Sequence, residues 1–394
     1  MDMFKKCYDF KEAGIARKAG YYPYFIPVES GHGAEAIVGG KKMIMYSRND
    51  YLGLTAHPEI KEAAKAAVEK YGASSTASRF ISGTLDIHCG LEEKIANFLG
   101  KESAVVFAAG MQVNLGVIPA IAGANDILIT DKFDHASILD GCRLSLAHNR
   151  RFRHNDTDSL EIVLKTLSND KGRIIVIDGV YSMEGDIAKL PQICKLAEKY
   201  DVKIMLDDAH GIGVLDKEKG RGTGAHFGLA DKIDLIVGSF SKSFASAGGF
   251  VAGDFPVIDY IKHFARSMVF SAALPVASTA TASKSLDIIQ REPQRRELLW
   301  NNTNKLLDGF KSLGFNTGKS CTPIIPIIIP SRMKAVALWQ ALFENGIFTN
   351  LIIPPAVPES RTMLRISVSA LHEDKHLDIL LEKSQKAGKK LGII

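Results

Sequence analysis

One lysine of the chain stands in a setting that suits covalent chemistry. Lys242 lies within Ser239–Ser243, which follows an apolar run starting at Leu235 and precedes small residues ending at Gly249. Lysine is usually a solvated surface residue, but small neighbours leave room for a flat ligand, and serine hydroxyls can donate to phosphate oxygens. Taken alone, the pattern fits either a surface charge or a lysine that forms a Schiff base.

A carboxylate at the end of a second apolar run favours the covalent interpretation. Asp207 follows Ile204, Met205 and Leu206, and an unpaired carboxylate at the end of a buried strand is unfavourable. A cationic partner removes this penalty, and the protonated ring nitrogen of pyridoxal 5'-phosphate (PLP) is one such partner. The alternative is a carboxylate that caps the following turn. The two runs together predict a PLP cofactor joined to Lys242.

Polar residues follow three further predicted strands. Asp178–Asp186 follows one strand, Asp131–Gly141 follows another and contains His135, and Gly110–Gln112 opens a helix after the first strand. Ligands of open α/β sheets bind beyond the carboxyl ends of the strands, so we expect these groups to converge there. His135 could stack on the cofactor ring or be a hydrogen-bonded loop histidine. Gly110–Gln112 could present helix N-terminal N–H groups to a phosphate.

The elements that position these residues are short β-branched runs alternating with helical patterns. The predicted strands are Ala104–Phe107, Ile127–Thr130, Arg173–Asp178, Lys203–Asp207, Leu235–Ser239 and Gly249–Ala252. Amphipathic stretches such as Leu160–Leu167 and Leu190–Tyr200 lie between them. This alternation is typical of an α/β fold, with a mainly parallel sheet covered by helices on both faces.

The pattern changes after about Ser271 and predicts a second domain. The later elements are a long helical region (Pro275–Gly314), a strand (Ile324–Ile329), a helix (Ala335–Glu344), a strand (Met363–Val368) and a lysine-rich final helix. Near the N-terminus, Ala36–Tyr46 predicts a hairpin that turns at Gly39–Gly40. We expect an N-terminal helix and hairpin segment (1–50), a large PLP-binding domain (51–275) and a small α+β C-terminal domain (276–394).

Composition limits the class of protein. The 394 residues carry a formal net charge of +5 without a basic tail, which argues against a dedicated nucleic-acid binder. The five cysteines are dispersed and form no CxxC pair, which predicts reduced thiols and no metal site. The first ten residues lack the apolar core of a secretory signal, and the longest apolar run is too short to span a bilayer. We expect a cytoplasmic protein whose contact with membranes is at most peripheral.

The order of these motifs resembles the α-oxoamine synthase family of fold-type-I PLP enzymes. The family includes serine palmitoyltransferase, aminooxononanoate synthase, aminoketobutyrate CoA ligase and aminolaevulinate synthase. The matching segments cover nearly the whole chain and are Asn49–Leu54, Ser78–Thr84, Asp134–Ser137, Asp178–Asp186, Asp207–Gly211, Ser239–Lys242 and Leu364–Ser367. The resemblance implies a large domain with a mainly parallel seven-stranded sheet, a small α+β C-terminal domain, and a homodimer with shared active sites.

The resemblance also implies roles for single residues. Lys242 would form the Schiff base and later move protons, Asp207 would pair with the pyridine nitrogen, and His135 would stack on the ring. His210 and Ser182 would contact the phenolic oxygen of the cofactor.

Further residues are implied in binding the rest of the cofactor and the substrate. The expected cofactor-binding residues around the phosphate are Gly110, Met111, Ser239, Ser241 and Ser271. Arg365 would grip the amino-acid carboxylate in a bidentate manner, helped by Asn49, and Arg79 is also expected to bind substrate.

The reaction implied is a decarboxylative condensation of an amino acid with an acyl thioester, which gives an aminoketone. Gly83–His88 and Phe240–Gly253 are most similar to the soluble bacterial serine palmitoyltransferases, which implies L-serine and a long-chain acyl-CoA or acyl carrier protein. Aminoketobutyrate ligase and the biotin-pathway synthase are the alternatives. The motif matches disfavour an aminotransferase of the same fold, and the presence of Lys242, Asp207 and His135 disfavours a non-catalytic subunit.

Some positions depart from the family pattern. Arg48 replaces a small residue before the Asn49 motif; it could make a surface salt bridge, the interpretation we favour, or serve an acidic amino acid such as cysteate. Ala109 and Ala273 stand where relatives often have hydroxyls. The basic stretch His148–His154 could attract coenzyme A phosphates or an acidic carrier, but we interpret it as an exposed strand edge carrying protective charges.

Overall fold

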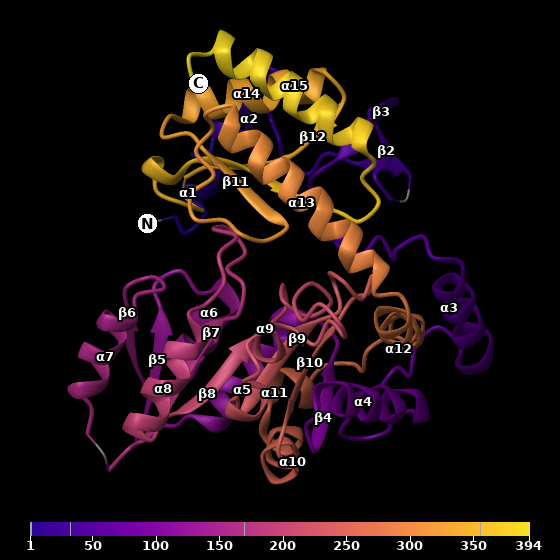
Figure 1. Cartoon of the computed structure of the whole chain (residues 1–394). Coiled ribbons are helices and arrows are strands. Elements are labelled where there is room, and N and C mark those ends of the chain that lie inside the picture. The colour runs from indigo at the N-terminus through magenta and orange to yellow at the C-terminus, as the bar shows by residue number, and fades with distance from the viewer. Residues whose placement is uncertain (1, 32, 169, 355) are drawn as a thin grey trace.

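The computed structural model describes residues 2–31, 33–168, 170–354 and 356–394. Figure 1 shows two lobes, and the lower one is built on a seven-stranded sheet ordered β4-β10-β9-β8-β7-β5-β6. The strands are β4 (Ser103–Phe107), β5 (Asp126–Asp131), β6 (His148–Phe152), β7 (Gly172–Asp178), β8 (Lys203–Asp207), β9 (Leu235–Ser239) and β10 (Gly249–Gly253). The strands from β6 to β9 pair in parallel, whereas β10 runs antiparallel to both neighbours. The predicted mainly parallel seven-stranded sheet is confirmed.

The six strands expected from the β-branched runs are all present, and the basic stretch supplies the seventh. β6 stands at one end of the strand order, and its first four residues are exposed. Arg150 and Arg151 therefore lie along an open sheet edge, where charge discourages pairing with another chain. This confirms the interpretation as a charged edge for His148–Arg151, whereas His154, at the end of the stretch, is largely buried.

Side chains of the sheet enter two separate hydrophobic clusters, because successive residues of a strand point to opposite faces. On β4, Val105 and Phe107 belong to one cluster, and Ala104 and Val106 belong to the other. The first cluster is covered by α5 (Gly110–Ile121), α6 (Ala136–Leu144), α10 (Phe255–Phe264) and α11 (Arg266–Val269). The second is covered by α4 (Asp86–Leu99), α7 (Thr157–Lys165), α8 (Leu190–Tyr200) and α12 (Val276–Arg291). Helices therefore cover both faces, as predicted.

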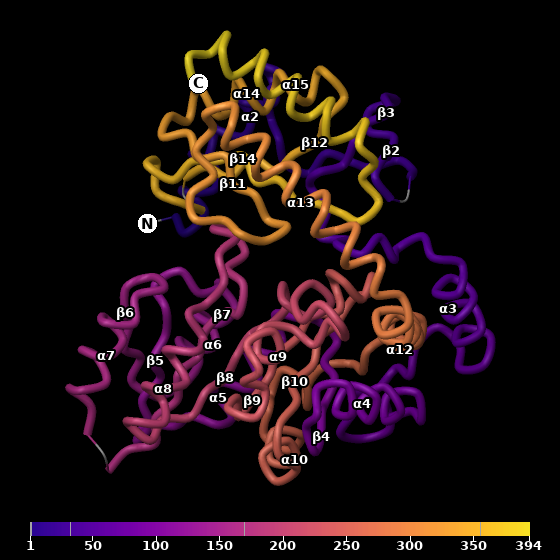
Figure 2. Tube along the Cα trace, viewed as in Figure 1, coloured from indigo at the N-terminus to yellow at the C-terminus, as the bar shows by residue number. Residues whose placement is uncertain are grey.

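The upper lobe combines C-terminal and N-terminal residues. One sheet, ordered β11-β14-β13, contains β11 (Ile324–Ile328), β14 (Met363–Ser367) and β13 (Asn350–Ile352). The other, ordered β1-β2-β3-β12, contains β1 (Val28–Ser30), β2 (Glu35–Val38), β3 (Lys41–Met45) and β12 (Ile347–Phe348). The parallel pairing of β12 with β3 joins the N-terminal hairpin to the C-terminal part of the chain, and Figure 2 shows the indigo and yellow parts of the trace in one lobe.

The predicted hairpin turn is also confirmed. β2 and β3 are antiparallel and are joined by Gly39 and Gly40, whose φ angles are +57° and +70°. Two successive positive φ angles are typical of a type I′ turn, which glycine adopts without a steric penalty.

The long helical region expected over Pro275–Gly314 is two helices. α12 ends at Arg291 and α13 (Gln294–Ser312) begins after Pro293, whose ring removes a backbone donor and interrupts a continuous helix. In Figure 1, α13 runs diagonally from the lower lobe into the upper one.

The remaining elements are mostly short. They are α1 (Lys5–Tyr8), α2 (Glu12–Lys18), α3 (Pro58–Tyr71), α9 (Thr223–His226), α14 (Arg332–Glu344), α15 (Asp374–Lys390), η1 (Ala230–Lys232) and η2 (Glu359–Arg361). None of the helices in the described part of the chain combines the length and the apolar character needed to cross a bilayer.

Candidate active site

The carboxyl ends of three neighbouring strands carry polar side chains at one edge of the large sheet. Asp178 ends β7, Asp207 ends β8, and the two are cross-strand partners. Ser239 ends β9, which is the next strand in the order. The ends of these three strands therefore lie together at one edge of the sheet, as expected.

A packed loop presents Lys242 at this edge. The N–H of Phe240 donates to Gly248 O at 2.9 Å, and the N–H of Ser246 donates to Phe240 O at 2.8 Å. Beneath the loop, the buried rings of Phe240 and Phe244 have centroids 5.3 Å apart. The lysine is thus carried on a turn that is closed by backbone hydrogen bonds and packed on buried aromatic rings.

Burial and the neighbouring charges both shift the pKa of Lys242. Burial lowers the pKa of Lys242, the carboxylates of Asp207 and Asp178 raise it, and the guanidinium of Arg365 lowers it further, with a net fall. A lysine with a lowered pKa holds more of the neutral amine that attacks an aldehyde.

The environment of Asp207 suits a carboxylate that pairs with a bound cation. It is buried and accepts hydrogen bonds from Asn114 Nδ2 at 2.7 Å and from the N–H of Ala209 at 3.1 Å. In the described part of the chain no ion pair to Asp207 is present. A protonated pyridine nitrogen would supply the missing charge, so the residues present fit PLP.

The neighbouring Asp208 has a different role. Burial raises its pKa to about 7, although hydrogen bonds from the N–H and hydroxyl of Thr223, each 2.6 Å long, act against this rise. A Cβ added at Gly211 or Gly222 would lie 1.9 or 2.0 Å from an Asp208 oxygen. Asp208 is therefore enclosed by the turn that follows β8 and fixes that turn.

The expected phosphate-binding residues come together at the N-terminus of α5. A Cβ added at Gly110 would lie 2.7 Å from Ser239 Oγ, and Ser239 Oγ lies 2.8 Å from Ser241 Oγ. Ser271 Oγ accepts a longer bond, 3.4 Å, from Gln112 Nε2, and Met111 is exposed. Hydroxyls and a helix N-terminus form a suitable environment for a phosphate dianion.

Two histidines line the same edge in the neutral form. Burial lowers the pKa of the His135 imidazole, and the backbone N–H of His135 donates to Asp178 Oδ2 at 2.7 Å. Burial and the charges of Lys242 and Arg365 hold the pKa of His210 well below its usual range. His210 Nδ1 lies 2.7 Å from the hydroxyl of Tyr51, which stays protonated because burial raises its pKa to about 12.

Arg365 is held beside Asn49, as expected. The guanidinium is buried, and its Nη1 and Nη2 both donate to Asn49 Oδ1 at 3.2 Å. Its Nε donates to the carbonyl oxygen of Ser182 at 2.6 Å, and Nη1 also donates to Ser367 Oγ at 2.7 Å. These contacts fix the plane of a guanidinium that lies close enough to Lys242 to influence its pKa.

The structure does not bring Arg79 into this group. Its Nη1 and Nη2 donate to the two carboxylate oxygens of Glu92 at 2.8 and 3.0 Å, and its Nε donates to Thr84 Oγ1 at 3.1 Å. Glu92 also accepts the N–H of Val106 on β4. Within one chain the guanidinium of Arg79 thus ties the segment before α4 to Glu92, the residue that joins α4 to the sheet, which differs from the expected contact with substrate.

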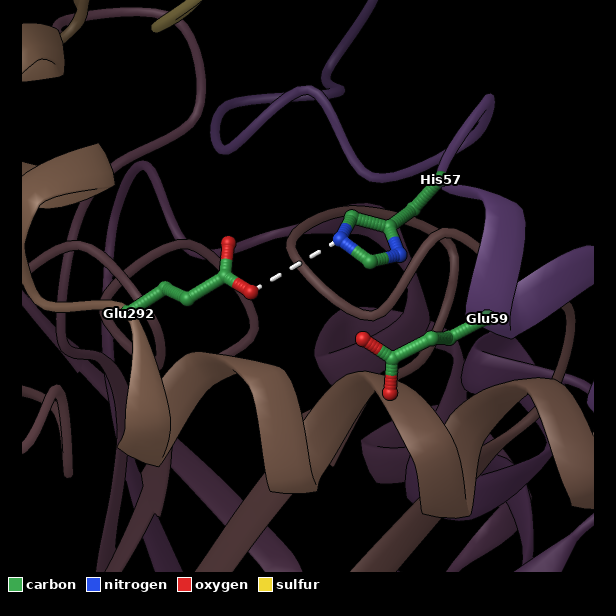
Figure 3. A group of neighbouring side chains, drawn as sticks. All are labelled: His57, Glu59 and Glu292. Carbon is green, nitrogen blue, oxygen red and sulfur yellow. Dashed lines mark ion pairs between the residues drawn. The ribbon is translucent and has the colours of Figure 1, made fainter.

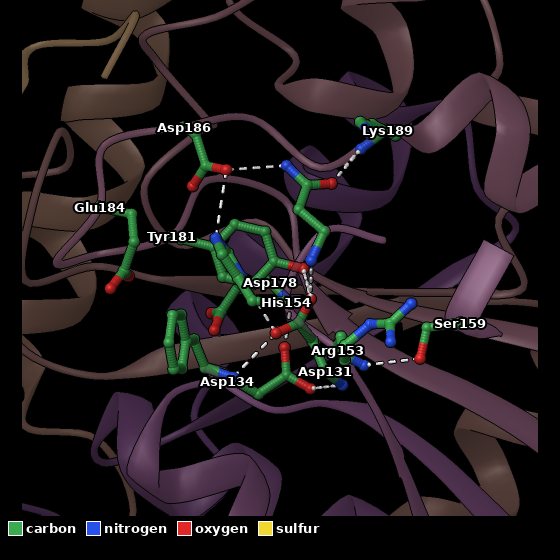
Figure 4. A network of polar contacts seen from close by, with 12 residues as sticks. Asp131, Asp134, Arg153, His154, Ser159, Asp178, Tyr181, Glu184, Asp186 and Lys189 are labelled. Atoms are coloured by element: carbon green, nitrogen blue, oxygen red, sulfur yellow. Dashed lines mark hydrogen bonds and ion pairs between the residues drawn. The ribbon is translucent and has the colours of Figure 1, made fainter. Parts of the chain in front are cut away.

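A buried acidic network lies behind the site (Figure 4). His154 places Nδ1 3.0 Å from Asp131 and Nε2 3.2 Å from Asp186. Burial alone would lower the pKa of His154, but the hydrogen bonds to both carboxylates outweigh it and raise the pKa to about 9. Asp134, buried among carboxylates including Asp178, has a pKa well above its usual range. The network fixes the loops after β5 and β7, which carry His135 and Ser182.

A second group of acidic and histidine side chains lies between α3 and α12 (Figure 3). His57, Glu59 and Glu292 come close enough to share an ion, but Arg291 pairs with both carboxylates, at 2.6 and 2.7 Å. Arg295 pairs with Glu292 as well, at 2.7 Å. The carboxylate charges are therefore neutralised by arginine, and the group joins two packed helices.

Three residues that hydrogen-bond to the predicted site residues were not predicted from the sequence. Asn114 hydrogen-bonds to Asp207 and to Ser137, and Ser137 hydrogen-bonds to His135. The hydroxyl of Tyr51 hydrogen-bonds to His210. A lone asparagine in the apolar helix Gly110–Ile121 was a signal, since a buried amide needs partners. Tyr51 and Ser137 lie inside the matched motifs, but their partners are distant in the sequence or on another strand.

The fold and this site define a fold-type-I PLP-dependent enzyme. The chain belongs to the aminotransferase class I and II family, whose model matches residues 41–383. The serine palmitoyltransferase of Sphingobacterium spiritivorum is 45% identical over 377 residues, which are 96% of this chain and 94% of that protein. The 8-amino-7-oxononanoate synthase of Thermoanaerobacter pseudethanolicus is 44% identical over 380 residues, which are 96% of each chain.

A solved structure shows the same architecture. The serine palmitoyltransferase of S. paucimobilis, with a bound PLP–myriocin aldimine, is 34% identical, has a TM-score of 0.96 and matches over 100% of both chains. These similarities confirm the resemblance to serine palmitoyltransferases, the expected fold class and the expected PLP cofactor.

Proposed function

We propose that this protein is a PLP-dependent acyltransferase that joins L-serine to the acyl group of a long-chain acyl-CoA. The products are an aminoketone such as 3-ketosphinganine, CO2 and the free thiol. The observation that carries the proposal is the fixed position of Arg365, which Asn49 and the carbonyl oxygen of Ser182, after β7, hold at the edge of the sheet that carries Lys242. An amino acid whose carboxylate lies at Arg365 can present its amine and Cα toward Lys242.

The side chains divide the work between binding and proton transfer. When bound, PLP supplies an aldehyde that condenses with amines and a ring that withdraws electrons from Cα. Asp207 would hold the proton of the ring nitrogen, and His135 would cover one face of the ring. Lys242 Nζ, with its lowered pKa, takes and returns a proton at Cα. Arg365 orients the carboxylate, supported by Asn49.

Two relatives of nearly equal identity leave a second candidate. Because 45% and 44% differ too little to select a substrate, the choice of serine and a long chain rests on Gly83–His88 and Phe240–Gly253. The runner-up is the condensation performed by 8-amino-7-oxononanoate synthases, followed by that of aminoketobutyrate CoA ligase.

Arg48 supports a narrower alternative for the amino acid. The expected surface salt bridge of Arg48 is not present among the described residues, and its Nη1 donates a long hydrogen bond, 3.4 Å, to Gly31 O. The positive charge of the guanidinium is therefore available to bind the sulfonate group of cysteate. Arg48→Ala tests this idea: a selective loss with cysteate supports the role, and equal losses with serine and cysteate exclude it.

We also propose a cytoplasmic homodimer with shared active sites, in contact with acyl-CoA or an acyl carrier protein. Large apolar side chains next to the phosphate-binding residues are exposed in the single chain, among them Met111, which follows Gly110, and Phe270, which precedes Ser271. Phe80 and Ile81, beside Arg79, are exposed as well. A partner subunit would cover these surfaces.

The test is a competition among substrates. The purified protein is incubated with equimolar serine, alanine, glycine, threonine and cysteate, with palmitoyl-CoA or acetyl-CoA, and products are identified by mass spectrometry. We expect a long-chain ketone that carries the serine side chain. A product from acetyl-CoA alone would contradict the long-chain assignment, and a sulfonate product would assign cysteate as the amino acid.

A further inference from the structure

A line of hydrogen bonds, buried except at its His135 end, joins the carboxylate of Asp207 to the imidazole of His135. Asn114 on α5 is 1% exposed, and its Nδ2 lies 2.7 Å from Asp207 Oδ2 and 2.9 Å from Ser137 Oγ. Ser137 is 2% exposed and places its Oγ 2.7 Å from His135 Nδ1. Side chains from β8, α5 and the start of α6 thus form one continuous line.

The direction of each proton in this line follows from the donors. The backbone N–H of Ser137 also points at His135 Nδ1, at 3.2 Å, and an N–H can only donate. Nδ1 is therefore an acceptor, so the hydroxyl of Ser137 donates to it. That hydroxyl in turn accepts from Asn114 Nδ2, whose second hydrogen goes to Asp207. The neutral ring of His135 then carries its proton on Nε2.

The amide of Asn114 has one orientation that fits. Rotating it by half a turn would bring its Oδ1 against the carboxylate of Asp207, and two acceptors would then face each other. In the observed orientation Asn114 Oδ1 is buried and finds no hydrogen-bond partner among the described residues. An unsatisfied buried oxygen is unfavourable, so the two donations from Nδ2 must outweigh it.

We propose that Asn114 and Ser137 are positioning residues that fix the ring tautomer of His135 and couple it to the carboxylate of Asp207. The proposal rests on the proposed function for the place of the cofactor between Asp207 and His135. The hydrogen bonds themselves lie wholly within this chain. Asn114 would hold the group that pairs with the ring nitrogen, while Ser137 would hold the group that covers the ring face.

The first experiment measures the tautomer directly. Protein labelled with 15N-histidine and freed of PLP is studied by two-bond 15N–1H NMR, with the His135 signals assigned by their loss in His135→Asn. We expect the wild-type ring proton on Nε2. In Asn114→Ala and in Ser137→Ala we expect the Nδ1–H tautomer to appear beside the Nε2–H one, because the longer bond from the backbone N–H of Ser137, at 3.2 Å, is then the only assured donor to Nδ1.

The second experiment measures the affinity for PLP by fluorescence titration. We expect Asn114→Ala to raise the dissociation constant about tenfold or more, since a hydrogen bond to a charged group is lost. The double variant should lose less than the product of the two single losses, because both belong to one line. Asn302→Ala is the matched control: its Nδ2 also makes two bonds, to Ser369 O and His372 O, in the upper lobe. We expect Asn302→Ala to change neither the tautomer of His135 nor the dissociation constant for PLP.

The results that overturn the proposal are specific. They are a wild-type proton on Nδ1, a tautomer and PLP affinity unchanged in Asn114→Ala, or an equal change in Asn302→Ala. If Asn114→Ala does not fold, the wild-type tautomer and Ser137→Ala decide in the same way. The tautomer requires neither PLP nor acyl substrate, so a protein that makes no aminoketone would remove the proposed function and leave this result standing.

Discussion

The guanidinium of Arg365 donates through Nε to the carbonyl oxygen of Ser182, at 2.6 Å. Arg365 belongs to β14 of the upper lobe, and Ser182 belongs to the loop after β7 of the lower lobe. The residue expected to bind the substrate carboxylate is therefore aimed by the contact between the lobes. Its position depends on how firmly the lobes are joined.

Replacing Arg365 with lysine should weaken amino-acid binding. Lysine keeps the charge but cannot donate at once to Ser182, Asn49 and a carboxylate. We expect kcat/KM for the amino acid to fall about 100-fold, mostly through KM, with PLP affinity nearly unchanged. Steady-state kinetics check this, with the exposed Arg143→Lys as the control. An unchanged KM would show that the carboxylate binds elsewhere.

A second contact between the lobes should be energetically coupled. The side chains of Glu184 and Arg361 form an ion pair, and Arg361 also lies 4.2 Å from the centroid of the Phe133 ring. Both members are largely buried, so a double-mutant cycle with Glu184→Gln and Arg361→Gln should give a coupling of about 1–2 kcal/mol. Urea unfolding supplies the free energies. If the losses in unfolding free energy of the two single variants simply add in the double variant, the ion pair makes no contribution to stability.

The stability contributed by His154 should depend on pH. Its folded pKa of about 9 exceeds the unfolded value of about 6.5, so the protonated form is stabilised by folding. The contribution is full below pH about 6.5 and is lost as pH rises through about 9. It amounts to at most about 3 kcal/mol.

Urea unfolding of the wild type and of His154→Gln across this range measures the effect. The wild type should lose its advantage over the variant between the two pH values. If both proteins show the same dependence on pH, His154 is not the group that titrates.

Removing the hydroxyl of Tyr51 should affect the site through His210. Tyr51→Phe deletes the 2.7 Å bond to His210 Nδ1 and leaves a buried nitrogen without its partner. We expect kcat/KM to fall about threefold to tenfold without a large loss of stability. The control is Tyr200→Phe, which removes the hydrogen bond from Tyr200 on α8 to Glu161 on α7. Equal activity of Tyr51→Phe and the wild type would exclude the role.

The sheet and the strand-end residues were predictable because their signals are local. β-branched runs mark β5, β7, β8 and β9, and each polar group at the site follows directly in the sequence. The nearness of Lys242 and Asp207 was predictable because they follow parallel strands, and the carboxyl ends of parallel strands share one edge of the sheet.

The contacts that were not predicted join residues far apart in the chain. The bonds from Asn114 to Asp207 and from Arg365 to Ser182 depend on the packing of helix on sheet and lobe on lobe. The pairing of β12 with β3 covers two residues and has no pattern of its own. Arg79 is similar: its motif is recognisable, but its partner Glu92 belongs to a helix that sequence spacing does not bring near.

The most direct test of the account concerns Lys242. The purified protein is loaded with PLP, reduced with borohydride, digested, and its peptides are mapped by mass spectrometry. A Schiff base is fixed by this reduction, so we predict a phosphopyridoxyl group on Lys242 in the wild type and none at this position in Lys242→Ala. A wild-type protein that binds PLP but carries the group on another lysine, or on none, would contradict the central claim.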